Sequence, residues 1–295
     1  MLNKDFGEVL TAMVTPFTES GEVNYEKLRE LADYLLDNGS DGLVVLGTTG
    51  EIPTLTKEEK KEILKTVVDE VGDRAKIIAG TGSYSTSASI EMTKEAEKIG
   101  VDGVMAVVPY YNKPPQDGLY KHFASIANNT SLPVMIYNVP GRTSKNIEVD
   151  TVKKLAELDN IIAIKEASGD LNQVAKLCAE LEDDFYVYSG DDSLTLPILS
   201  VGGQGIVSVA SHIVGNKIKE MVTLFKSGKV NKAIALNKEL VTVFNAMFIT
   251  TNPIPVKESL NIIGMNVGPL RSPLISLNNK EREKIKSVLK SNNII

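Results

Sequence analysis

The sequence predicts a (β/α)8 barrel followed by a C-terminal helical extension. Short runs rich in Val, Ile and Ala alternate with longer amphipathic segments, there are eight such runs, and the runs are apolar almost throughout. Strands that are covered on both faces have this composition. An open doubly wound sheet is the alternative, but it usually carries a glycine-rich phosphate loop after its first strand. Here the first run ends in TPF, which favours the barrel.

The eight runs are the predicted strands. Parallel strands need crossover helices, and right-handed crossovers wind all the units in one direction. The runs are VLTAMVTPF (9–17), GLVVLG (42–47), KIIAGTG (76–82), GVMAVVP (103–109), PVMIYNVP (133–140), IIAIKEAS (161–168), FYVYSG (185–190) and GIVSV (205–209).

The segments between the runs have the period and the end signals of helices. In 24–39 the leucines fall on one face, and in 56–72 Thr56 stands three residues before Glu59, the spacing of a capping box. A helix often ends at a residue in the left-handed conformation, for which glycine is favoured. We expect this conformation at Gly39 and Gly72.

After about residue 210 the pattern becomes helical. The segment 217–228 is expected to close the barrel, and 230–248 and 279–291 are expected to form further helices. No Gly/Ser-rich or Pro-rich linker separates the two parts. We therefore expect residues 1–228 to form the barrel and residues 229–295 to form an extension packed on it.

Composition and charge exclude several classes of protein. The hydrophobic fraction is 42% and the charged fraction 24%, close to the average of soluble globular proteins. The net charge of −6 argues against a nucleic-acid partner. The single cysteine, Cys178, permits no intrachain disulfide, no apolar run approaches the roughly 20 residues needed to cross a bilayer, and the first residues lack a signal-peptide pattern. We expect a cytoplasmic protein that binds neither nucleic acid nor membrane.

In a barrel of this kind the active site lies at the carboxyl ends of the strands. The candidates are therefore the polar residues at the strand ends or just after them. They are Thr15, Thr48, Thr49, Thr81, Ser83, Tyr110, Tyr111, Tyr137, Asn138, Arg142, Lys165, Glu166, Ser168, Ser189 and Asp191.

Lys165 is the most informative of these candidates because it interrupts an otherwise apolar strand, IIAIKEASG. Burial lowers the pKa of a lysine and makes its neutral amine available as a nucleophile. The alternative is a lysine that reaches solvent or pairs with a carboxylate such as Glu166. Side-chain alternation sends Lys165 and Glu166 to opposite faces of the strand, so only one of them points into the barrel.

Two residues near the end of the preceding strand could assist such an amine. The Tyr137 phenol could move a proton to or from a carbonyl oxygen, and Arg142 could hold a carboxylate with two parallel hydrogen bonds. Alternatively, Tyr137 is a core tyrosine with a structural role and Arg142 is a surface arginine of the loop. Their predicted proximity to Lys165 favours a role in catalysis or binding.

The histidines and the glycine cluster predict no further chemistry. His122 and His212 are too few and too far apart in sequence for a histidine-rich zinc site, and we expect structural roles for both. The cluster GGQG (202–205) precedes the last strand, so it belongs at the opposite end of the barrel from the phosphate site of many such barrels. The sequence therefore argues against a phosphorylated substrate.

Several motifs resemble those of a known family, the Schiff-base-forming pyruvate lyases and aldolases, which includes dihydrodipicolinate synthase and N-acetylneuraminate lyase. The resemblance spans nearly the whole chain, and PYYNKP with YNVPGRT is closest to the 4-hydroxy-tetrahydrodipicolinate synthase (dihydrodipicolinate synthase) branch. The motifs are GTTGE (47–51), PYYNKP (109–114), YNVPGRT (137–143), IKEASGD (164–170), SGDD (189–192) and NPIPVK (252–257).

The resemblance implies condensation of pyruvate with aspartate 4-semialdehyde, the first committed step of diaminopimelate and lysine biosynthesis, with no metal or organic cofactor. It implies a homo-oligomer, typically a dimer of dimers, in which one tyrosine of each site comes from the neighbouring subunit. The implied roles are an imine on Lys165, proton transfer through Tyr137, Thr48 and the neighbour's Tyr111, binding of the pyruvate carboxylate by Thr49, Gly190 and Val207, and binding of the semialdehyde carboxylate by Arg142.

One departure from the family concerns regulation. Many bacterial members are inhibited by lysine at a site between subunits, which matches Ile52, Pro53, Lys57, Lys60, Tyr84, Ala88 and Tyr110. Ala88 replaces a glutamate there, and Lys57 and Lys60 would repel a cation, so we expect weak or absent feedback. Two alternatives to the main activity remain: an aldolase of the same family that acts on sugar acids, and a non-catalytic barrel that binds a ligand.

Overall fold

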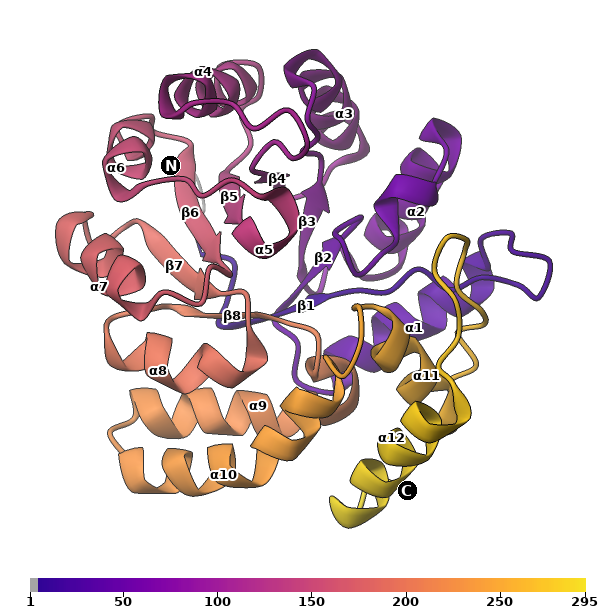
Figure 1. Ribbon diagram of the computed structural model, residues 1–295. Helices are drawn as coiled ribbons and strands as arrows, with labels where there is room; N and C mark the ends of the chain where they lie inside the picture. Colours follow the sequence, from indigo (N-terminus) through magenta and orange to yellow (C-terminus); the bar gives the residue numbers. More distant parts are fainter. Residues whose placement is uncertain (1–4) are drawn as a thin grey trace.

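Eight parallel strands close into a barrel in the computed structural model, which describes residues 5–295 (Figure 1). Each strand pairs with the next along the chain, and β8 pairs with β1, so the predicted fold is confirmed. The strands are β1 (Val9–Ala12), β2 (Gly42–Val45), β3 (Lys76–Gly80), β4 (Gly103–Val107), β5 (Val134–Asn138), β6 (Ile161–Glu166), β7 (Tyr186–Ser189) and β8 (Gly205–Ser208).

Helices surround the barrel and continue into the extension (Figure 1). The outer ring consists of α1 (Tyr25–Asp37), α2 (Lys57–Val71), α3 (Thr86–Ile99), α4 (Gln116–Ala127), α6 (Val149–Ala156), α7 (Leu171–Glu180), α8 (Thr195–Ser200) and α9 (Ser211–Lys226). Short helices lie in the loops after the strands: η1 (Ile52–Thr54), α5 (Pro140–Thr143) and η2 (Asp192–Leu194). The extension consists of α10 (Val230–Ala246), α11 (Ile254–Ile262) and α12 (Asn279–Ser291).

The strands are shorter than the apolar runs that predict them. The run 9–17 is a strand only as far as Ala12, yet Met13, Val14 and Phe17 beyond it are buried. The loops at this end of the barrel are themselves packed, so apolar composition does not mark where a strand ends.

The ends of the first two helices test the predicted terminal signals. Thr56 and Glu59 form the expected capping box, and Gly39 is left-handed at φ +94°. The expectation for Gly72 is wrong, since its φ is −66°. Gly72 N–H still donates to Val68 O at 2.9 Å, and the amides of Arg74 and Ala75 donate to Val71 O. The chain therefore leaves α2 through a right-handed turn that needs no left-handed residue.

Two helices of the last third differ from the expected segments. α9 begins at Ser211, six residues before the predicted 217, and it is kinked at Val214, where φ is −130°. α11 was not expected, since Pro253 and Pro255 obscure its start. Proline is compatible with the first turn of a helix, where no intrahelical N–H bond is lost.

The core is divided between two layers. One layer lies between the strands and the helices, and a smaller cluster fills the lumen. The lumen cluster includes Phe6, Leu10, Val44, Ile78, Met105, Met135, Tyr137, Ile162, Tyr188 and Val207. These side chains close the barrel interior, so a ligand can enter only at an end.

The extension packs on the barrel through α10, which lies along α9 (Figure 1). The chain then returns to the carboxyl ends of the strands, where Lys257 of α11 donates to the backbone oxygen of Thr15 at 2.9 Å. Within residues 5–295, no helix has both the length and the apolar composition that crossing a bilayer requires.

Candidate active site

Lys165 lies buried near the carboxyl end of β6 and points into the lumen. Its neighbours in register are Tyr137 of β5 and Tyr188 of β7, and its Nζ is 4.4 Å from the centre of the Tyr137 ring. Among residues 5–295, no carboxylate forms a hydrogen bond or an ion pair with Nζ, and Asp192 acts on it only through its charge. Burial lowers the pKa of Lys165 to about 8, with a partly opposing effect of Asp192. About a tenth of the amine is therefore neutral at pH 7, against fewer than about one in a thousand for an ordinary lysine.

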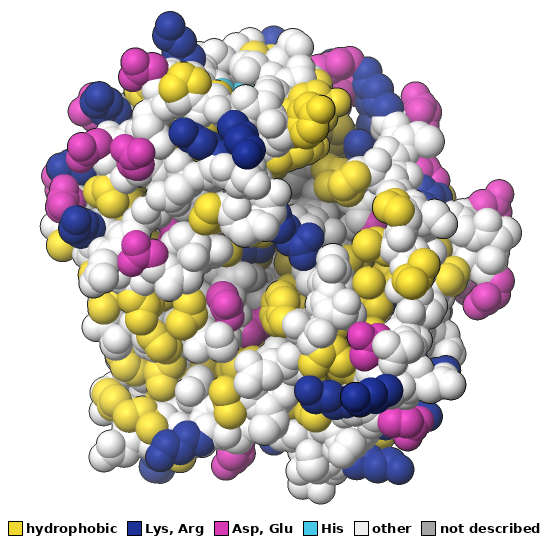
Figure 2. Space-filling model, in the orientation of Figure 1, with side chains coloured by type: hydrophobic (Ala, Val, Ile, Leu, Met, Phe, Trp, Pro, Cys, Tyr) yellow, Lys and Arg dark blue, Asp and Glu magenta, His cyan; other side chains and the backbone are white. Residues whose placement is uncertain are grey.

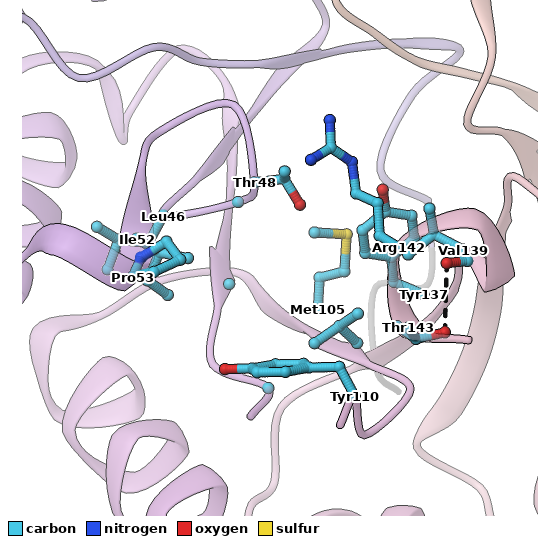
Figure 3. A pocket seen from close by; sticks show the side chains of 14 residues that line it. Leu46, Thr48, Ile52, Pro53, Met105, Tyr110, Tyr137, Val139, Arg142 and Thr143 are labelled. Carbon is cyan, nitrogen blue, oxygen red and sulfur yellow. Dashed lines mark hydrogen bonds between the residues drawn. The ribbon is translucent and has the colours of Figure 1, made fainter. Parts of the chain in front are cut away.

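Tyr137, whose ring lies beside this amine, is hydrogen-bonded to Thr48. Burial raises the pKa of the Tyr137 phenol, while Arg142 and a hydrogen bond with the Thr48 hydroxyl lower it. A phenol held by a hydroxyl can pass a proton without becoming a stable phenolate. Figure 3 shows Thr48, Tyr137 and Arg142 pointing toward a common space.

That space is a cavity of about 210 Å³. Thr48, Met105, Tyr110, Tyr137 and Arg142 are among the residues that line it (Figure 3). The space-filling view shows the same face of the molecule hollowed near its centre (Figure 2). The volume suits one or two small organic acids, and the single cationic side chain in its lining is that of Arg142.

Thr49, Gly190 and Val207 occupy the neighbouring strand ends. The Thr49 hydroxyl accepts a hydrogen bond from Asn252 Nδ2 at 3.0 Å. A Cβ on Gly190 would lie 2.8 Å from Ala167 Cβ and 3.1 Å from Lys165 Cε, so only glycine leaves room beside the lysine. Val207 is buried in the lumen cluster.

Several predicted candidates face away from the lumen. Asn138 Nδ2 donates to Glu166 Oε2 at 3.0 Å on the outer side of the strands, as the alternation of side chains requires. Asp191 caps η2 by accepting from Ser193 N. The alternative reading of Lys165 as a lysine paired with Glu166 is therefore wrong.

Tyr111 is also outside the cavity of its own chain. Its side chain is 91% exposed, and its backbone is left-handed at φ 70°. The neighbouring Tyr110 lines the cavity and packs edge-on against Tyr84, with ring centres 5.3 Å apart. The PYYNKP loop thus directs one tyrosine inward and one outward.

Sequence reasoning missed two residues close to the site. Asp192 is buried and accepts hydrogen bonds from Ser208 and from the amides of Val209 and Ala210. Burial raises its pKa to about 6. Asn252 bridges Thr49 and Arg142, whose Nη2 donates to the Asn252 carbonyl at 3.1 Å. The motifs SGDD and NPIPVK contain both residues, but nothing in their spacing reveals these contacts.

Four of the seven positions that match the effector site, among them Ile52, line a second cavity of about 190 Å³, whereas Pro53 and Tyr110 line the first cavity. Lys57, Lys60 and Ala88 are among its lining residues. Lys57 pairs with Glu91, and burial lowers the pKa of Lys60. Both lysines thus lie at the cavity on which the feedback prediction depends.

Comparison with known proteins places this site in a family. The sequence profile of the Dihydrodipicolinate synthetase family matches residues 5–292. The chain is 58% identical to 4-hydroxy-tetrahydrodipicolinate synthase of Desulforudis audaxviator, over 97% of each chain, and 57% identical to that of Desulforamulus reducens, over 98% of each. The crystal structure of dihydrodipicolinate synthase from Bacillus anthracis superposes with a TM-score of 0.95 at 51% identity, over 97% of this chain and 98% of that one. The chain belongs to the dihydrodipicolinate synthetase family.

Proposed function

We propose that the chain condenses pyruvate with aspartate 4-semialdehyde to give 4-hydroxy-tetrahydrodipicolinate, the first committed step of diaminopimelate and lysine biosynthesis, through an imine on Lys165. The activity follows from the family and from relatives that bear this name along their full length. The single observation that supports the chemistry is a buried amine with no carboxylate partner in the described chain, next to a tyrosine.

The reaction begins when the neutral Nζ of Lys165 attacks the keto carbon of pyruvate and water leaves. The resulting imine loses a proton from the methyl carbon and becomes an enamine, which adds to the aldehyde of the second substrate. The amine of that substrate then attacks the imine carbon, closes a six-membered ring and releases Lys165. The lysine itself serves as the electron sink, so the scheme needs no metal or organic cofactor.

The other site residues bind and transfer protons in this scheme. Tyr137 gives and takes protons, with Thr48 linking it to Tyr111 of a neighbouring subunit. Thr49 and the backbone at Gly190 and Val207 hold the pyruvate carboxylate, and Arg142 holds the carboxylate of the semialdehyde at the cavity mouth. Both substrates are anions and the chain has a net charge of −6, so binding depends on these local donors.

We infer a homo-oligomer, a dimer of dimers, in which Tyr111 completes the site of a second copy. The exposed Tyr111 and Tyr84 support one interface. A second exposed apolar group supports another interface. It consists of Val230, Ile234 and Val241 at helical spacing on α10, and of Phe248 just after that helix. Figure 2 shows apolar side chains over this part of the molecule. We also infer a cytoplasmic location, which the single cysteine supports.

Borohydride reduction in the presence of pyruvate tests the proposal. We expect a covalent pyruvate adduct that peptide mass spectrometry maps to Lys165, and turnover with aspartate semialdehyde but not with N-acetylmannosamine. An unmodified Lys165 would instead indicate a non-catalytic barrel. Turnover with N-acetylmannosamine alone would indicate a sugar-acid aldolase.

A further inference from the structure

Two charged side chains that are far apart in the sequence form a buried ion pair beside the candidate active site. Lys257 Nζ lies 2.8 Å from Glu51 Oε1, and the two side chains are 1% and 0% exposed. Lys257 belongs to α11, and Glu51 ends the loop after β2 that carries Thr48 and Thr49. The reaction scheme uses neither charge. Because burying two charges costs more than burying apolar groups of similar size, the pair is weak evidence for stability and favours a role in specifying one arrangement.

The hydrogen bonds of this pair are complete. Lys257 Nζ also donates to the backbone oxygens of Thr15 at 2.9 Å and of Pro269 at 2.7 Å, and lies 4.2 Å from the centre of the Phe17 ring. The second carboxylate oxygen of Glu51 accepts from Arg271 N at 2.9 Å. The three N–H groups of the ammonium and both oxygens of the carboxylate are thus used, which fixes the position of Glu51 as well as neutralising its charge.

The loop that Glu51 ends, residues 46–51, has a conformation that its surroundings must hold. Leu46 and Glu51 are both left-handed, at φ 60° and 55°, although neither is glycine. Such residues persist where neighbouring contacts determine the backbone. The same C-terminal segment supplies Asn252, which bonds to the Thr49 side chain and, through its carbonyl, to Arg142.

We propose that the Glu51–Lys257 pair is a positioning device that sets loop 46–51 so that Thr48 reaches Tyr137 and Thr49 faces the pyruvate carboxylate. This inference rests on the proposed function. Glu51 and Lys257 act through the two threonines and are positioning residues. Their removal weakens pyruvate capture at Lys165 even in protein that remains folded.

Two variants and a matched control test this role. Lys257→Met removes the ammonium at nearly constant volume, and Glu51→Gln/Lys257→Met removes both charges together, which avoids a buried unpaired carboxylate. Arg282→Met is the control, because it breaks the Arg282–Glu258 ion pair of the same extension, in which Arg282 is 52% exposed. Borohydride-trapped adduct is measured against pyruvate concentration at a temperature where circular dichroism shows each protein folded. Hydrogen–deuterium exchange is measured for the peptide that covers residues 46–51.

We expect the pyruvate concentration for half-maximal trapping to rise at least tenfold in both Lys257 variants and to stay unchanged in Arg282→Met. Exchange in 46–51 should become faster in the Lys257 variants alone. If this pyruvate concentration stays within twofold of the wild-type value in folded variants, the inference is overturned while the proposed function stands. If Lys257→Met does not fold, the double variant provides the test. If the wild type itself gives no adduct, the proposed function fails, and unchanged exchange in 46–51 then overturns the positioning role as well.

Discussion

The molecule contains two buried lysines that differ in their surroundings rather than in their pKa. Burial lowers the pKa of both Lys165 and Lys257 to about 8. Lys257 donates to three oxygens, one of them in Glu51, whereas Lys165 lies over the Tyr137 ring with no carboxylate partner among residues 5–295. Deprotonation of Lys257 would cost one of these three hydrogen bonds and leave the new lone pair facing an acceptor oxygen, so the pair could not reach a substrate carbon. A lowered pKa alone therefore does not identify a nucleophile; the free directions around the nitrogen do.

Substitution by methionine should change the free energy of unfolding in opposite directions at Lys165 and at Lys257. This is the largest difference that we expect between the two lysines. Lys165→Met should abolish the pyruvate adduct and turnover, yet raise the free energy of unfolding by about 3 kcal/mol at pH 7, since it removes an amine whose pKa is depressed by more than two units. Lys257→Met should lower the free energy of unfolding by about 3–5 kcal/mol, since it leaves the buried Glu51 carboxylate without the cation that pairs with it. Urea denaturation measures both.

The sign of the Lys165 effect can be checked by pH. Its folded pKa is below its unfolded value of about 10.4, so the unfolded chain binds more protons between pH 8 and 10.4 and the wild type gains stability as the pH rises through that window. The advantage of Lys165→Met should shrink there. A constant difference between the two proteins from pH 7 to 10.4 would contradict the lowered pKa.

The hydrogen-bond partners of Lys257 all come from its own chain. The site of Lys165 is proposed to include Tyr111 of a second copy, and Tyr111→Phe tests this difference. Turnover should fall about 10²-fold, the usual contribution of a proton-transfer group. The fold of the subunit itself should be unchanged, because the side chain is 91% exposed within its own chain. Mixing Tyr111→Phe with Lys165→Met subunits and allowing exchange should restore activity, since some hybrid sites then contain both groups. No recovery in confirmed hybrids would place Tyr111 outside the relay.

The charge of Asp192 has a smaller effect, on the pKa of Lys165 and not on that of Lys257. Asp192 raises the pKa of Lys165, so Asp192→Asn should shift the rise of the adduct-formation rate, half-maximal near pH 8 in the wild type, to lower pH by up to about one unit. Arg282→Met serves as the control and should leave the profile in place. A shift to higher pH would show that Asp192 does not stabilise the ammonium.

The smallest effect is expected for the addition of L-lysine, which would have to bind beside Lys57 and Lys60. With Lys57 and Lys60 at the second cavity and Ala88 in place of an acid, sub-millimolar L-lysine should leave turnover unchanged. Initial rates at saturating and at half-saturating pyruvate are the appropriate measurement. Saturable inhibition in that range would show that the cavity accepts a cation.

The barrel and the position of Lys165 were predictable because both follow from local pattern. Eight apolar runs define the strands, and alternation within IKE separates Lys165 from Glu166, which bonds to Asn138 on the outer side. The Glu51–Lys257 pair and the Asn252–Thr49 bond were not predictable, since they join residues 206 and 203 positions apart. Contacts at that separation leave no period in the sequence, and only the closed fold brings them together.

The return of the extension to the strand ends has a consequence for synthesis on the ribosome. A nascent chain that has emerged as far as α10 contains Lys165, Tyr137 and the threonines of loop 46–51, but it has neither Asn252 nor Lys257 to hold that loop. The amine of Lys165 therefore acquires its finished surroundings only after Asn252 and Lys257, which lie close to the end of the chain, have left the ribosome. Under the proposed positioning role, a chain truncated after α10 would capture pyruvate only weakly, although its barrel sequence is intact.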